Sequence, residues 1–147
     1  MIWLLRHGHA ADGSPDAERP LTEKGEAQSR AAGAALRALE VNIGACLTSP
    51  KVRAAETARL ACQELGDLVP TEEVRLSGGP FDAEELVAGR GEHVLLVGHD
   101  PDLSMAVHTL TGAQVRMSKG GLAGVARGEL KVLLRPAELS AMALAVR

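Results

Sequence analysis

The sequence predicts an α/β protein, a single three-layer domain in which helices flank a mostly parallel sheet. Short apolar runs alternate with segments of helical periodicity, which is the pattern of buried parallel strands joined by helices. The length of 147 residues suits one domain with a real core and is too short for two. Two apolar runs separated by Arg127-Gly128 predict an antiparallel pair near the C-terminus.

Two strands and two helices are expected in the first half of the chain. Apolar runs mark the strands, while N-capping residues and a glycine stop mark the helices. The expected elements are a strand over Ile2–Leu5, a helix capped by Thr22 and reaching about Glu40, a strand over Ala45–Thr48, and a helix begun by Ser49-Pro50 and stopped by Gly66. In the second helix, Ser49 should be the N-cap and Pro50 should take the first helical position.

The second half continues the alternation and ends with the antiparallel pair. The expected elements are an edge strand over Glu72–Leu76, a short helix from Asp82 to about Ala88, a strand over His93–Val97, a helix opened by Pro101, strands over Leu122–Ala126 and Glu129–Leu134, and a final short helix from Pro136. Parallel sheets bind ligands at the carboxyl ends of their strands. Arg6-His7 and His99 both follow strands, so we expect them to converge on one edge of the sheet.

Composition excludes several classes of partner. The net charge is -3 and the only aromatic residues are Trp3 and Phe81, so neither a basic field nor stacking platforms for nucleic acid are available. No apolar run approaches the roughly 20 residues of a membrane-spanning helix, and Arg6 interrupts the first run too early for a signal peptide. Cys46 and Cys62 lie in apolar surroundings without a metal-ligand spacing, as buried reduced thiols do. These features predict a cytoplasmic protein that binds neither nucleic acid nor membrane.

Four residues have the side chains that phosphoryl transfer requires. Cations and hydrogen-bond donors must surround the phosphoryl oxygens, and covalent catalysis needs a neutral nucleophile. Arg6, His7, Arg53 and His99 supply these types. Arg53 is informative because it lies in the first turn of the second helix, where the macrodipole disfavours a cation unless an anion binds there. Lys51, beside it, is interpreted as a solvated surface charge.

Four ordered segments carry a resemblance to a known family. They are Leu5-Arg6-His7-Gly8, Pro20-Leu21-Thr22-Glu23-Lys24-Gly25, Ser49-Pro50-Lys51-Val52-Arg53-Ala54-Ala55-Glu56-Thr57-Ala58, and Val97-Gly98-His99-Asp100-Pro101. In order and spacing they are similar to the successive motifs of the histidine phosphatase superfamily, whose fold is phosphoglycerate mutase-like. The short chain and Arg19-Pro20-Leu21-Thr22 resemble the small SixA-like phosphohistidine phosphatase branch.

The resemblance implies one histidine phosphatase domain over residues 1–147 and hydrolysis through a phosphohistidine intermediate, without a metal or other cofactor. It implies that His7 is phosphorylated, that Arg6 and Arg53 bind the phosphoryl group, and that His99 hydrogen-bonds it. The implied substrate is a phosphorylated group, with a phosphohistidine-bearing protein as the expected partner. Two guanidiniums beside His7 should lower the pKa of its imidazole and keep it neutral near pH 7.

The chain departs from the family pattern at several positions. His9 and Gly13 stand where many larger relatives have a glutamate and a phosphate-binding asparagine, and His9 is interpreted as a surface histidine. Candidates for a general acid are Glu84, Glu85 and Asp82. The last two have capping-box spacing, which leaves Glu84 as the acid to test. Arg19 is expected either to contact substrate or to form an exposed salt bridge.

Other readings of the sequence make different predictions. The spacing from Cys46 to Arg53 is one residue too long for the phosphate loop of cysteine-dependent phosphatases. Asp100 opens a segment similar to the D-x-D-x-T/S motif of magnesium-dependent haloacid-dehalogenase-like phosphatases, but too little chain follows it. His7-x-His9 is a weak metal pair because alternate residues point to opposite faces of an extended chain. A small-molecule phosphomonoesterase, a mutase and a non-catalytic phosphate-binding scaffold remain as alternatives, and the short segment between Thr57 and His99 counts against the mutase.

Overall fold

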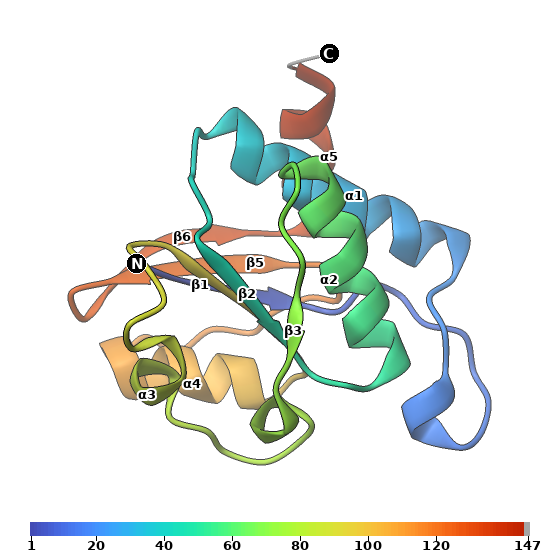
Figure 1. Ribbon diagram of the computed structural model, residues 1–147, viewed down its shortest axis with the longest axis horizontal. Coiled ribbons are helices and arrows are strands. Elements are labelled where there is room, and N and C mark those ends of the chain that lie inside the picture. The colour runs from blue at the N-terminus through green and yellow to red at the C-terminus, as the bar shows by residue number, and fades with distance from the viewer. Residues whose placement is uncertain (146–147) are drawn as a thin grey trace.

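A six-stranded sheet forms the centre of the computed structural model, which describes residues 1–145 (Figure 1). The strand order is β3-β2-β4-β1-β5-β6. The strands are β1 (Ile2–Arg6), β2 (Ala45–Thr48), β3 (Thr71–Glu72), β4 (Val94–Gly98), β5 (Leu122–Ala126) and β6 (Glu129–Leu134). β3, β2, β4 and β1 are parallel, whereas β5 pairs antiparallel with β1 and β6 pairs antiparallel with β5. The predicted fold class, including the antiparallel pair near the C-terminus, is confirmed.

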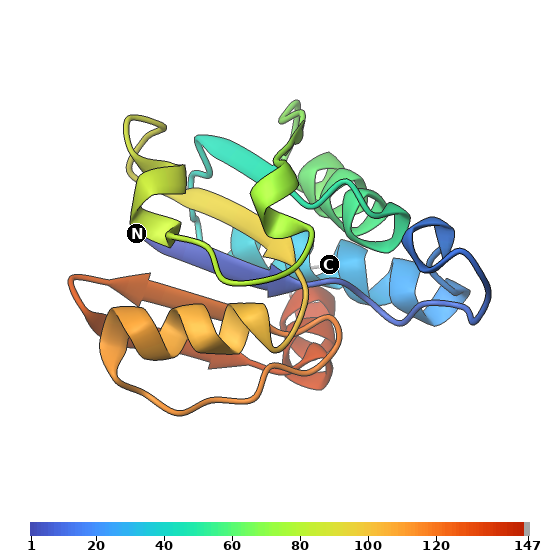
Figure 2. The same ribbon diagram turned by 90° about the horizontal axis from the view of Figure 1, so that it is seen from below.

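Helices cover both faces of this sheet. They are α1 (Glu23–Ala38), α2 (Val52–Glu64), α3 (Ala83–Val87), α4 (Asp102–Thr111) and α5 (Pro136–Ala145), with 3-10 turns η1 (Asp16–Glu18) and η2 (Val74–Leu76). Figures 1 and 2 show α1, α2 and α5 on one face and α3 and α4 on the other. In the part of the chain that the structure describes, no helix is both long and apolar enough to cross a membrane.

Successive side chains of each strand point to opposite faces of the sheet, so the core consists of two clusters, one on each face. In β1, Trp3 and Leu5 pack toward α1, α2 and α5, while Leu4 packs toward α3 and α4. All three side chains are buried. Because both faces are covered, the strand needs apolar residues at every position, and this explains the continuous run from Ile2.

α1 and α2 lie against each other through very small residues. A Cβ atom added at Gly33 of α1 would lie only 2.2 Å from the carbonyl oxygen of Ala61 in α2. Real Cβ atoms do not approach backbone this closely, so glycine is required for the two helices to pack as they do. Thr22 begins α1 as predicted, since its Oγ1 accepts a hydrogen bond from the N–H of Gly25 at 3.1 Å.

The start of α2 differs from the prediction. The helix begins at Val52 with Lys51 as its N-cap, and Ser49-Pro50 precedes it. The Oγ of Ser49 accepts a hydrogen bond from the N–H of Lys51 at 3.2 Å, which forms a local turn before the helix. Ser49 is therefore not the N-cap, and Pro50 does not take the first helical position.

The edge strand is also shorter than predicted. Only Thr71–Glu72 pairs with β2, and Val74–Leu76 forms the 3-10 turn η2. The carboxylate of Glu73 accepts hydrogen bonds from both the backbone N–H and the side chain of Arg75. These local bonds compete with strand pairing and turn the chain away from the sheet.

Candidate active site

The carboxyl ends of β1 and β4 bring the two predicted histidines together. Arg6 pairs with Gly98 in the register of these neighbouring strands, and the N–H of His7 donates to the carbonyl of Gly98 at 3.0 Å. His7 and His99 thus leave the same edge of the sheet, with their ring centroids 5.2 Å apart. The structure confirms the prediction that these residues converge on one edge of the sheet.

His7 is held in a single tautomer by its neighbour. Its Nδ1 lies 2.8 Å from the carbonyl oxygen of Gly8, which can only accept a hydrogen bond, so the proton of the neutral ring is on Nδ1. Nε2 therefore carries the lone pair, and the Nε–H of Arg53 donates to it at 3.4 Å. With only 6% of its surface exposed, His7 presents a neutral, oriented nitrogen to a cation.

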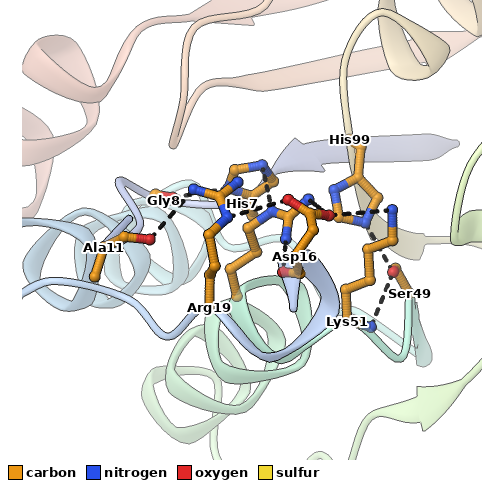
Figure 3. A network of polar contacts seen from close by, with 9 residues as sticks. His7, Gly8, Ala11, Asp16, Arg19, Ser49, Lys51 and His99 are labelled. Carbon is orange, nitrogen blue, oxygen red and sulfur yellow. Dashed lines mark hydrogen bonds and ion pairs between the residues drawn. The ribbon is translucent and has the colours of Figure 1, made fainter. Parts of the chain in front are cut away.

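Arg53 reaches this edge from the first turn of α2. Its side chain is as buried as that of His7, and each of its nitrogens has a partner. Beside the contact with His7, Nη1 donates to the carbonyl of Asp16 at 2.9 Å and Nη2 donates to the carboxylate of Asp16 at 3.2 Å. Figure 3 shows Asp16 between Arg19 and Lys51 in this network.

His99 is oriented by Ser49. The Nε2 of His99 lies 2.8 Å from Ser49 Oγ, which already accepts the N–H of Lys51. The hydroxyl hydrogen of Ser49 can point to Nε2, and in that arrangement the imidazole proton is on Nδ1. His99 Nδ1 is buried and has no hydrogen-bond partner among residues 1–145.

Arg6 is anchored by the segment that precedes β5. Its Nη1 donates to the carbonyl of Met117 at 2.8 Å, and the N–H of Met117 donates to Ser104 Oγ at 3.1 Å. Ser104 in turn donates to the carboxylate of Asp100 at 2.8 Å. This chain of contacts ties the residue after His99 to the guanidinium of Arg6. Arg6 Nε is itself buried without a partner within the described residues.

The loop after His7 is packed against α1 and α2 through small groups. The N–H of Gly8 donates to Thr57 Oγ1 at 3.1 Å, and Thr57 donates to the carbonyl of Arg53 at 2.7 Å. A Cβ atom at Gly8 would lie 2.6 Å from the carbonyl oxygen of Gly25. Glycine at position 8 therefore allows the loop to sit close enough for His7 and Arg53 to meet.

Burial and cations lower the pKa values of both histidines. Loss of hydration is the largest cause for His7, whose pKa falls to about 4, and the positive charges of Arg53 and Arg6 add to it. For His99 the pKa falls to about 3, first through burial and then through the charges of His7 and Arg53. The direction expected for His7 is found, but burial contributes more than the arginines do.

These pKa values make a prediction for titration in phosphate-free buffer. The NMR signals of the His7 and His99 ring protons should not shift between pH 8 and pH 5, whereas an ordinary histidine titrates near 6.5. Because the unfolded chain binds these protons first, the folded protein should lose stability as the pH falls below about 6.5. A midpoint near 6.5 for either ring would contradict the arrangement described above.

Two other predicted residues lie in different places. Arg19 donates to the carboxylate of Asp16 at 3.1 Å and to the carbonyl of Ala11 at 3.2 Å, so it belongs to the polar network of the site. Glu84 lines a cavity of about 570 Å³ with Met1 and Ile2. Figures 1 and 2 show α3 beside the N-terminus, at the opposite end of β1 from His7. The expectation that Glu84 acts as a general acid at His7 is therefore corrected.

The remaining acid candidates and His9 have structural contacts. The carboxylate of Asp82 accepts a hydrogen bond from the N–H of Glu85 and caps α3, as the sequence predicts. His9 is half-buried rather than a free surface residue, and its Nδ1 lies 2.8 Å from Thr22 Oγ1. It thereby joins the loop after His7 to the start of α1.

Asp16 and Ser49 are site residues that sequence reasoning missed. The sequence analysis predicts Ser49 only as a helix cap and makes no prediction for Asp16. The position of Ser49 beside Arg53 within one motif was a usable signal, whereas nothing near Asp16 in the sequence links it to Arg53.

Together these residues form a site suited to an oxyanion. Buried Arg53 and half-buried Arg6 supply positive charge, while Arg6 Nε and His99 Nδ1 are buried polar atoms that need a partner. His7 Nε2 provides a lone pair beside Arg53. The fold and the site thus define an α/β protein with arginines and buried histidines gathered at one edge of its sheet, an arrangement chemically suited to an oxyanion.

Comparisons with known proteins agree with this class. The family model for the histidine phosphatase superfamily (branch 1) matches residues 2–77. An uncharacterised protein of Picosynechococcus sp. (strain ATCC 27264 / PCC 7002 / PR-6) is 35% identical over 147 residues, covering 89% of this chain and 87% of that protein. The chain belongs to the histidine phosphatase superfamily, and its activity is that of a phosphatase.

Solved structures share the fold at low sequence identity. A structure of the protein histidine phosphatase SixA complexed with tungstate has a TM-score of 0.75 at 24% identity and covers 94% of this chain and 98% of its own. For a putative phosphohistidine phosphatase SixA from Agrobacterium tumefaciens, the TM-score is 0.79 at 22% identity, with 92% and 97% covered. A putative alpha-ribazole-5'-P phosphatase from Escherichia coli str. K-12 has a TM-score of 0.70 at 20% identity, with 92% and 96% covered.

Proposed function

We propose that this phosphatase hydrolyses phosphohistidine on a protein, through a phosphohistidine intermediate on its own His7. The observation that carries the proposal is the state of His7: a buried, neutral imidazole whose Nδ1 is held by Gly8 and whose Nε2 lone pair meets Arg53. A nucleophile for phosphoryl transfer needs this protonation state and orientation. The similarity to SixA structures supports the choice of substrate only through the shared fold.

The proposed reaction has two displacements at phosphorus. In the first, His7 Nε2 attacks a phosphohistidine whose ring is already protonated on its other nitrogen. A new N–P bond forms and the N–P bond of the substrate breaks, so the substrate imidazole leaves as a neutral ring. In the second, water attacks the phosphoryl group on His7, its proton is released, and inorganic phosphate departs. His7 recovers its lone pair, and the balance is one water consumed for each phosphate formed.

The other site residues would stabilise the charge that this transfer develops. Arg53 and Arg6 supply guanidinium donors, and His99 supplies an N–H from Nδ1 in the tautomer favoured by Ser49. Preorganised donors of this kind typically contribute a factor of roughly 100 to 1000 each to the rate. Because these cations neutralise the phosphoryl oxygens, we propose that the reaction needs no metal ion.

The preference for phosphohistidine rests on the leaving group. An alkoxide must be protonated as it leaves, whereas a protonated phosphoimidazole departs without an enzyme acid. Among the described residues, Asp16 is the carboxylate in contact with Arg53, and the hydrogen bond from Arg53 lowers its pKa, which keeps it ionised. Glu84 lines a cavity with Met1. Neither is suited to protonate an alkoxide at His7.

A substrate panel in the presence of a metal chelator tests this proposal. We expect kcat/KM for a phosphohistidine protein to exceed that for a sugar phosphate by at least about 100-fold, with an aryl phosphate between them, because only the alkoxide needs a strong acid. Glu84→Gln is the control variant and should leave all three values unchanged. Comparable rates on a sugar phosphate, with a large loss in Glu84→Gln, would instead make the protein a small-molecule phosphomonoesterase. Binding without turnover on every substrate would favour a phosphate-binding scaffold.

We also propose that the protein works in the cytoplasm. Cys46 and Cys62 are both free and buried. The neighbouring thiol raises the pKa of Cys46 and lowers that of Cys62, so the two sulfurs are close together and yet unlinked. Neighbouring reduced thiols are typical of a reducing compartment.

A further inference from the structure

Three cations from two separate segments converge on one exposed carboxylate. Asp16 Oδ2 lies 3.2 Å from Arg53 Nη2 and 3.8 Å from Lys51 Nζ, and its Oδ1 lies 3.1 Å from Arg19 Nε. Figure 3 shows this carboxylate at the centre of the network. The Asp16 side chain is 60% exposed, whereas that of Arg53 is only 7% exposed. Asp16 therefore covers the solvent side of a buried guanidinium.

Asp16 uses the donors that a phosphoryl group on His7 would require. Nη1 and Nη2 of Arg53 both donate to Asp16, one to its carbonyl and one to its carboxylate, while Nε donates to His7 Nε2. A phosphoryl group bonded to Nε2 removes that acceptor and brings three oxygens beside the same guanidinium. The incoming oxygens and the Asp16 carboxylate must then compete for Arg53.

A phosphoryl group should displace the Asp16 carboxylate from Arg53. The Asp16 side chain is mostly exposed, so solvent weakens its ion pairs. Asp16 also lies in the one-turn 3-10 segment η1 of an exposed loop. A phosphoryl dianion carries more charge and more acceptor oxygens than a carboxylate, so its hydrogen bonds to arginine are stronger. Free inorganic phosphate would make the same contacts with the arginines. It lacks the rest of the substrate, whose additional contacts would help a phosphorylated substrate to bind.

We propose that Asp16 is an internal competitor for the phosphoryl group, which holds Arg53, Arg19 and Lys51 in the empty site and weakens the binding of free inorganic phosphate. The inference rests on the proposed function, because it assumes that this network receives the phosphoryl group of the substrate. Its consequence is a site that accepts a phosphoryl group carried by a larger substrate and releases the phosphate product.

A role for Asp16 in positioning Arg53, instead of competing for it, predicts the opposite change in phosphate affinity when the Asp16 charge is removed. If Asp16 only positioned Arg53, removing its charge would let the guanidinium move and would weaken phosphate binding. If Asp16 competes, removing the charge strengthens that binding. Asp16→Asn separates the two roles because asparagine keeps the size of the side chain and one acceptor oxygen.

Titration calorimetry with inorganic phosphate measures this effect without any need for turnover. Asp12→Asn is the matched control, since it removes the same charge from the same loop at an exposed residue. Arg53→Ala identifies the binding that belongs to the site. We expect Asp16→Asn to lower the Kd for phosphate roughly fivefold to twentyfold, as Coulomb interaction over a few ångströms near the surface implies. Asp12→Asn should lower it by no more than about twofold because of screening.

The outcomes distinguish this inference from the proposed function. Phosphate binding that depends on Arg53, but is no tighter in Asp16→Asn than in Asp12→Asn, would overturn the competitor role alone. Weaker binding in Asp16→Asn would also overturn it, in favour of a positioning role. If none of the proteins showed Arg53-dependent binding, the oxyanion site itself would be wrong, and the proposed function would fail with it.

Discussion

Replacement of His7 by alanine is expected to reduce phosphatase activity by at least about 100-fold, because it removes the atom to which the phosphoryl group is proposed to bond. His99 cannot replace His7 as the nucleophile, because its Nε2 is hydrogen-bonded to Ser49 and its ring centroid lies 5.2 Å from that of His7. The measurement is a rapid quench, without acid, of wild-type enzyme with labelled substrate. It should trap the label on His7.

His9→Ala is the matched control for this experiment. His9 lies two residues further along the same loop, and its ring contacts Thr22 instead of the arginines. Activity should therefore stay within a few-fold of the wild type. Circular dichroism of both variants checks that the loop change leaves the fold intact. Retention of more than a few per cent of activity in His7→Ala would exclude a covalent mechanism through this residue.

Replacement of Arg53 by alanine should lower kcat/KM by roughly two to three orders of magnitude, the loss typical of one preorganised transition-state donor. Arg53 is the buried cation that directly contacts His7 Nε2, so alanine leaves the phosphoryl oxygens without their nearest guanidinium. Both kcat and kcat/KM should fall if the donor acts mainly in the transition state. Steady-state kinetics on the phosphohistidine protein provide both values.

Lys51→Ala controls for disturbance of the helix start. Lys51 is the N-cap of α2 and lies two residues before Arg53. Its Nζ is 3.8 Å from Asp16, and among the described residues it forms no hydrogen bond or ion pair with His7. Its removal should change kcat/KM by less than about tenfold, as expected for a screened, partly exposed charge. Equal losses in the two variants would mean that the first turn of α2 meets the phosphoryl group through a different face.

The apolar pattern of the sequence was sufficient for most of the fold. β2, β5, β6 and the start of α5 lie at the predicted residues, because buried strands and a proline-initiated helix have strong local signals. The two misassigned regions, at Ser49-Pro50 and Val74–Leu76, are places where a side chain bonds to nearby backbone. A single hydrogen bond of this kind can replace a helical or strand hydrogen bond locally, and the periodicity of apolar residues does not reveal it.

The sequence by itself determined that His7 and His99 would each follow a buried strand and lie at one edge of the sheet, since apolar runs ending in polar residues mark the carboxyl edge of a parallel sheet. Only the tertiary structure decided which polar residues join them. Asp16 reaches Arg53 across 37 positions of the chain, and Met117 reaches Arg6 across 111. Glu84, in contrast, lies at the other end of β1. Contacts over such separations depend on how loops pack against one another, and no local periodicity in the sequence encodes that packing.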